Sequence, residues 1–122
     1  MQRLNLAVAG LEQALVCPPP APRTWRHVVQ QRMASVGAAL TAEEVVEECA
    51  VAARAGRLHR ERTRLLDRLG SLGTRLTDAT PDEDAERLRR HLLRLSHDIS
   101  HHHQRVTDLA YDADGRDVGG SE

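Results

Sequence analysis

The chain has 122 residues, of which 40 % are hydrophobic and 29 % are charged, and its formal net charge is −1. This length suits one domain with a modest core, and a charge near zero gives no global field that would attract nucleic acid or a membrane. There is no apolar run of about 18 residues, no secretory signal pattern and no closely spaced cysteine pair, so we expect a cytoplasmic protein without a membrane partner.

The first predicted element is a short amphipathic helix over residues 1–16. Its apolar residues recur every three or four positions, as on one face of a helix: Leu4, Val8, Leu11 and Leu15. This stripe is too narrow for a helix that stands alone, so we expect it to dock on the rest of the chain or on a second copy. A proline-rich linker over residues 17–23 follows, because consecutive prolines disfavour a helix and favour an extended spacer.

Residues 24–114 are predicted to form the body of a helical bundle. Its first helix begins near Trp25, which we interpret as a core anchor because no other aromatic residue is near it in the sequence. A capping pattern at 41–44 and a change in the phase of the apolar stripe predict a break or kink near residue 41. After this break, the residues expected to be buried are Val45, Val46, Cys49, Ala52 and Ala53.

Two long helices are predicted to complete the bundle. One is expected from Leu58 to Leu76 after a turn or kink at Gly56, and the other carries a heptad seam from Ala85 to Ala113. A capping pattern at 80–83 predicts the start of the last helix, and Asp114-Gly115 predicts its end. Residues 115–122 are expected to form a flexible tail. The predicted fold is therefore all-α, a bundle of four to five helices with a long C-terminal heptad-patterned helix.

Each seam of the two long helices contains one polar residue. When these helices are paired as antiparallel neighbours, Arg62 and His102 fall in the same layer. Two basic groups need an acceptor when they are buried, and Glu47, Glu48 and Glu61 are the candidates. We therefore predict a buried polar layer of Arg62 and His102 with Glu47 and Glu48, which fixes the register of the helices. If the layer has only this role, His102→Leu should be at least as stable as the wild type.

A second hypothesis is that these residues bind a metal ion. Helical bundles bind metal ions through inward-facing glutamates and histidines, so His102 with Glu47, Glu48 and Glu61 would be the ligands for iron or zinc. A third hypothesis is RNA binding through a run of arginines, which consists of Arg54, Arg57, Arg60, Arg62, Arg64 and Arg68. Interspersed acidic residues and the absence of aromatic residues in this run favour a solvated surface, so nucleic acid is not the expected partner.

The last part of the chain resembles small helical proteins of high-GC bacteria and, more distantly, the hemerythrin-like bundles. The segments that carry the resemblance are His102-His103-Gln104-Arg105, Asp108-Leu109-Ala110-Tyr111-Asp112-Ala113 and Asp117-Val118-Gly119-Gly120. The resemblance implies a helical bundle, di-iron chemistry with oxygen or nitric oxide, and descent of His102 from a metal ligand. Arg62 and Glu43 stand where this pattern would have histidines, which implies that an ancestral metal site is degraded.

The sequence contains no catalytic motif, phosphate loop or cofactor fingerprint. We therefore predict a non-enzymatic helical-bundle protein without a cofactor, which acts through contact with a protein partner or with itself as a homodimer. The alternatives are a hemerythrin-like metal-binding bundle and an RNA-binding protein that uses its arginines.

Overall fold

The computed structural model describes the backbone of residues 2–16, 22–78 and 85–120, and the side chains of residues 3–16, 23–77 and 85–114. In this part of the chain there are four α-helices and one short 3-10 helix, and there is no strand. The elements are α1 (Gln2–Val16), α2 (Pro22–Ala42), η1 (Cys49–Val51), α3 (Ala52–Asp78) and α4 (Ala85–Gly120). The prediction of an all-α helical bundle is confirmed.

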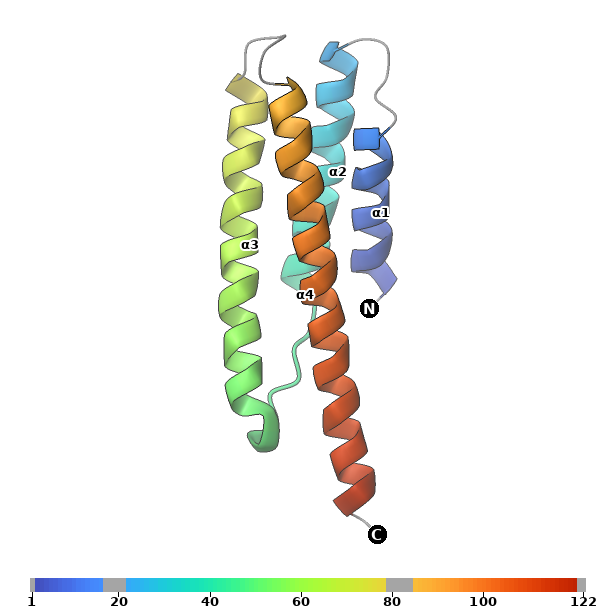
Figure 1. Cartoon of the computed structure of the whole chain (residues 1–122), viewed down its shortest axis with the longest axis vertical. Helices are drawn as coiled ribbons and strands as arrows, with labels where there is room; N and C mark the ends of the chain where they lie inside the picture. The colour runs from blue at the N-terminus through green and yellow to red at the C-terminus, as the bar shows by residue number, and fades with distance from the viewer. Residues whose placement is uncertain (1, 17–21, 79–84, 121–122) are drawn as a thin grey trace.

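The four helices run alternately up and down and form a closed ring (Figure 1). Helix α1 contacts α2 and α4, and helix α3 also contacts α2 and α4. Each helix therefore packs against the elements that lie next to it in this ring, as in an up-down-up-down bundle. None of the helices in the described part of the chain is long and apolar enough to cross a membrane.

Helix α1 is held in the ring by burial of its apolar stripe and by two side chains that bind its last carbonyls. The indole Nε1 of Trp25 donates a hydrogen bond to the Ala14 carbonyl at 3.1 Å, and Nε of Arg89 donates to the Leu15 carbonyl at 2.7 Å. The last carbonyls of a helix have no partner within that helix, so these two bonds close its C-terminal end. Trp25 is buried, which confirms that it is a core anchor.

The helices differ in length, and this difference divides the bundle into two halves. At about 1.5 Å per residue, α1 is roughly 22 Å long and α4 roughly 54 Å long. Four helices surround the closed half, which comprises α1, α2, residues 63–78 of α3 and residues 85–101 of α4. Only α3, α4 and the segment 43–51 form the open half, which is the lower part of Figure 1.

The hydrophobic core is divided at the same level. The larger cluster contains the buried residues of α1 and α2 with the α3 and α4 seams as far as Leu65 and Ile99. The smaller cluster lies in the open half and consists of Val51, Ala55, Leu58, Val106 and Leu109. The apolar ladder therefore stops after Leu65 and Ile99 and resumes at Leu58 and Val106, as the sequence predicts.

The connection between α2 and α3 has the predicted break, but the residues after the break differ from the prediction. Helix α2 ends at Ala42, close to the predicted break, but residues 43–48 are not helical, and Glu48 has an extended backbone conformation. An extended segment does not preserve helical spacing, so the apolar phase restarts at Val51 and Ala55, which are buried. Cys49, Ala52 and Ala53 are exposed instead, and Gly56 lies within a continuous helix.

The two ends of α4 also differ from the sequence analysis. The predicted stop at Asp114-Gly115 is wrong, because α4 continues to Gly120 and none of the described glycines has a positive φ. The expected tail is thus helical over 115–120, and residues 121–122 lie outside the described part. The predicted cap at 80–83 and the linker residues 17–21 also lie outside it, whereas Pro22 begins α2, a position where its missing N–H has no cost.

Candidate functional site

A cluster of charged side chains occupies the boundary between the two hydrophobic clusters. It contains Glu43 from the segment after α2, Glu61 from α3, and His102, His103 and Arg105 from α4. His102 is fully buried, and the side chain of Glu43 is only 4 % exposed. The structure therefore places a charged cluster at the level where the sequence predicts a polar layer.

The ring of His102 lies between two carboxylates. Its Nδ1 is 2.7 Å from Oε1 of Glu61, and its Nε2 is 3.4 Å from Oε1 of Glu43. The first contact is a hydrogen bond, whereas Glu43 Oε1 and His102 Nε2 have no hydrogen-bond partner among the described residues. Because an imidazolium donates from both nitrogens, this arrangement is complementary to the protonated ring.

Glu43 is held by both its side chain and its backbone. Its Oε2 binds Nδ1 of His103, and its backbone carbonyl accepts a hydrogen bond from Arg62. Arg62 also donates to Nδ1 of His59 at 2.9 Å, while Nε2 of His59 is 2.7 Å from Oε1 of Glu47. These bonds require the His59 tautomer that carries its proton on Nε2, and they fasten the extended segment to α3.

The environments of both glutamates lower their pKa. Burial raises the pKa of the Glu43 carboxyl, but the contacts with His102 and His103 and the charges of these rings outweigh it, so the pKa lies below the ordinary value of 4.5. For Glu61, burial again raises the pKa, and the bonds from Arg105 and His102 with their charges reverse the effect. Both side chains are therefore stabilised as carboxylates.

These shifts predict a loss of stability in acid. A carboxyl with a lower pKa in the folded state binds protons less readily than in the unfolded state, so its contribution is present above about pH 5 and is lost as the pH falls below 4.5 through the folded-state pKa. We expect the free energy of unfolding, measured with urea between pH 7 and pH 3, to fall less steeply for Glu43→Gln than for the wild type. Glu44→Gln, which changes the exposed neighbour, should keep the wild-type dependence. Equal slopes for all three proteins would contradict this prediction.

The structure corrects the membership of the predicted layer. Glu47 is 71 % exposed and contacts His59, and Glu48 is also exposed, so neither residue reaches His102. Arg62 is partly buried beside the cluster but binds the Glu43 carbonyl and His59 rather than His102. The acceptors of the layer are Glu43 and Glu61, because the extended conformation of 43–48 turns Glu43 inward and leaves Glu47 and Glu48 at the surface.

The same residues do not fit iron or zinc. The proposed ligands Glu47 and Glu48 point to solvent, and both nitrogens of His102 face carboxylates of Glu43 and Glu61. No group of three or more His, Cys, Asp or Glu side chains in the described part of the chain is arranged to hold a metal ion. Arg105 also lies 2.6 Å from Glu61 and supplies positive charge where a dication would need ligands.

Sequence reasoning missed Glu43 and His103. Glu43 is not among the acceptors that the sequence suggests, yet the structure buries its side chain against two histidines. The pair His102-His103 was the signal in the sequence that could have indicated a second acceptor. Adjacent residues on a helix point in different directions, so two buried histidines need acceptors from more than one neighbouring element. Glu61 meets one of them from α3, and Glu43 meets both from the segment after α2.

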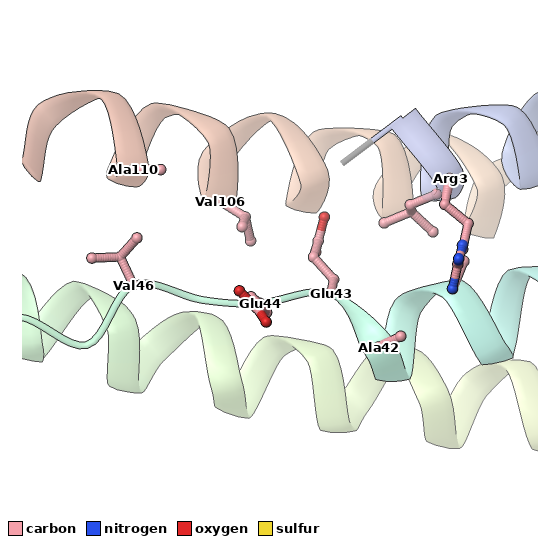
Figure 2. Close-up of a pocket in the computed structure, with 9 residues that line it drawn as sticks. Arg3, Ala42, Glu43, Glu44, Val46, Val106 and Ala110 are labelled. Carbon is pink, nitrogen blue, oxygen red and sulfur yellow. The ribbon is translucent and has the colours of Figure 1, made fainter. Parts of the chain in front are cut away.

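A hollow of about 690 Å³ lies beside the cluster, at the boundary between the closed half and the open half. It is lined by Arg3, Leu4, Ala39, Ala42, Glu43, Glu44, Val46, Val106 and Ala110. Figure 2 shows Val46 and Glu43 rising from the extended segment towards α4, with Ala110 and Val106 facing them. The hollow thus joins apolar side chains of α1, α2, the segment 43–48 and α4 at the level where α1 begins and α2 ends.

Comparisons with known proteins give no relative. No family model matches the sequence, no curated protein matches it, and no solved structure matches the fold. The resemblance to the hemerythrin-like bundles therefore stays a hypothesis.

Proposed function

We propose that this chain is a non-enzymatic helical-bundle protein that acts by binding protein, and that it binds a second copy of itself through the open half. The observation that supports this proposal is the unequal cover of the two hydrophobic clusters. The larger cluster is enclosed by four helices, whereas the smaller one is covered by α3, α4 and a short extended segment. The apolar hollow adjoins the smaller cluster where a further helix would pack in a complete bundle.

A second copy supplies a helix of suitable length and position. The last turns of α4 run past the other elements of the chain (Figure 1), and a helical end without neighbours has little stability of its own. In a two-fold dimer, the end of α4 from each copy packs along the hollow of the other, so one contact made twice covers both surfaces. Tyr111, which is 78 % exposed on α4 near these last turns, provides an aromatic anchor for such a contact.

The charges at the two surfaces are compatible with this arrangement. Arg3 lines the hollow, and Asp114 is exposed on α4 just before its last turns. Neither makes an ion pair with another described residue of its own chain. In the dimer, Arg3 of one copy and Asp114 of the other are opposite in charge and stand at the edge of the contact, where such pairs guide association more than they strengthen it.

The proposal predicts that a charge placed in the hollow abolishes self-association. We expect wild-type protein to sediment at twice the monomer mass of 13.5 kDa at micromolar concentration, and Ala110→Glu to sediment as a monomer, because an unpaired carboxylate would be buried at the contact. Leu6→Glu is the matched control, since Leu6 is exposed on α1 and does not line the hollow.

A monomeric wild-type protein at all concentrations would contradict the proposal. So would an Ala110→Glu dimer as tight as the wild type. Loss of the dimer in Leu6→Glu as well would place the contact on the closed half and would also contradict it.

A further inference from the structure

A second surface, in the closed half, carries positive charge without a described counter-charge. It is formed by residues late in α3 and early in α4, the ends of these helices that are uppermost in Figure 1. We propose that Arg75, Arg87, Arg90 and Arg94, with His91, form a binding surface for the phosphate backbone of duplex nucleic acid. The surface is distinct from the hollow of the open half, so this inference does not depend on the proposed dimer.

Most arginines elsewhere in the bundle are engaged within the chain. Of the run that the sequence suggests for RNA binding, Arg54 pairs with Asp112 at 2.9 Å and Arg68 with Asp98 at 2.8 Å. Two further arginines of this run donate hydrogen bonds to backbone carbonyls. Arg62 binds the carbonyl of Glu43, and Arg64 binds a carbonyl of its own helix. The predicted run is therefore largely committed to internal contacts.

The four arginines of the proposed surface make no ion pair or hydrogen bond with the described residues. They line two adjoining hollows, which share His91 and Arg94. The first, of about 410 Å³, is lined by Arg87, Arg90, His91 and Arg94. The second, of about 310 Å³, is lined by Arg68, Ser71, Leu72, Arg75, His91 and Arg94. Among the described residues, no acidic side chain lines either hollow, and the nearby Asp98 and Glu86 are bound by Arg68 and Arg89.

The spacing of these side chains suits a row of phosphates. Arg87 and Arg94 are seven residues apart on α4, which separates them by about 10 Å along the helix axis. Phosphates of one strand recur about every 3.4 Å along a duplex axis while they wind around it, so a row of this length can contact more than one phosphate. Guanidinium groups bind phosphate oxygens through two parallel hydrogen bonds, and Arg75 on α3 extends the row sideways.

The side chains of the proposed surface, and the lack of exposed aromatic and apolar side chains beside them in the described part of the chain, favour a duplex over a single strand or a membrane. A single strand is usually bound by aromatic side chains on which bases stack, and the two aromatic residues of the chain are Trp25, which is buried, and Tyr111, which lies in the open half. A membrane surface would require exposed apolar side chains beside the arginines, whereas Leu72, Leu88 and Leu92 are buried. The expected contact is therefore with the backbone and independent of sequence.

The test is fluorescence anisotropy of labelled 20-base-pair DNA and RNA duplexes titrated with the full chain. We expect a Kd of roughly 1–100 µM at physiological salt and a slope of log K against log salt of about −3.6 for four arginines. Arg90→Gln/Arg94→Gln should weaken binding at least about tenfold and reduce the slope by about 1.8. The matched control is Arg57→Gln/Arg60→Gln, which removes two exposed charges from the open half and should change the Kd less than twofold.

Circular dichroism and thermal unfolding of each variant establish that the fold is unchanged. Tighter binding of either duplex identifies DNA or RNA as the natural source of the phosphates and supports the proposal. Absence of duplex binding by the wild type, or equal weakening in both double variants, would overturn it. Binding of polyglutamate as tightly as of duplex would also overturn it, because the partner would then be an acidic polypeptide.

Discussion

His102→Leu is expected to lower the free energy of unfolding by about 3–5 kcal/mol, the range found when one partner of a buried ionic pair is removed. The substitution leaves the Glu43 carboxylate in a position where its side chain is 4 % exposed, with His103 as its remaining partner. Because domains of this size are stable by only about 5–15 kcal/mol, the loss would be a large share of the total. Urea unfolding followed by circular dichroism measures it.

This prediction replaces the expectation, drawn from the sequence, that His102→Leu is at least as stable as the wild type. Ser96→Ala is the control, since Ser96 is also fully buried on α4, and its hydroxyl has no described partner, so its removal should raise stability by up to about 1 kcal/mol. If the cost of His102→Leu comes from an unpaired charge, Glu43→Leu/His102→Leu will be more stable than His102→Leu alone. A neutral effect of His102→Leu would refute the ionic account of this layer.

Trp25→Ala should lower the free energy of unfolding by about 3–5 kcal/mol, as is usual for truncation of a buried tryptophan. Trp25 fills the contact between α1 and α2, and its indole closes the end of α1 through the Ala14 carbonyl. The variant should therefore also free α1, which limited proteolysis followed by mass spectrometry would detect as early cleavage within residues 2–16.

Trp25→Phe is the control that separates the loss of core volume from the loss of the hydrogen bond to α1, because it keeps an aromatic ring in the core and removes the indole N–H. Its cost should be smaller than that of Trp25→Ala, with about 1 kcal/mol from the lost hydrogen bond. A Trp25→Ala protein that loses less than 1 kcal/mol and resists cleavage within α1 would show that α1 is held by other contacts.

The parts of this fold that follow a regular period could be predicted from the sequence. The α3 and α4 seams place Leu76 to Leu58 and Leu88 to Val106 in the core, with one polar layer among them, and the structure confirms both features. The heptad rule succeeds here because these helices are antiparallel neighbours, so that their layers can be counted from the loop that joins them.

The parts that depend on non-periodic backbone could not be predicted. Glu43 enters the interior at the point where α2 has ended and residues 43–48 are not helical, and no helical count places a non-helical segment against a distant helix. Gly115 is another example, since the Asp-Gly pair is typical of a helix end and yet α4 continues through it. The sequence therefore names His102 and Glu61 of the five residues in the cluster and misses Glu43, His103 and Arg105.

The charged cluster links the fold to the proposed function. It fixes the segment 43–48 against α3 and α4 through Glu43, and the same segment forms one wall of the hollow. Variants that break the cluster should therefore disturb the proposed contact as well as stability. In contrast, the arginine surface lies in the closed half and should be unaffected by them.

The most direct test of the central claim, that a second copy covers the open half, is hydrogen–deuterium exchange measured by mass spectrometry at concentrations well below and well above the dimer Kd. We predict that slower exchange at high concentration is confined to the elements around the hollow, which are the first turn of α1, the last turn of α2, residues 43–51 and residues 104–120. Exchange that does not depend on concentration in these residues, or protection that appears in the first half of α2 and the upper part of α3 instead, would contradict the account.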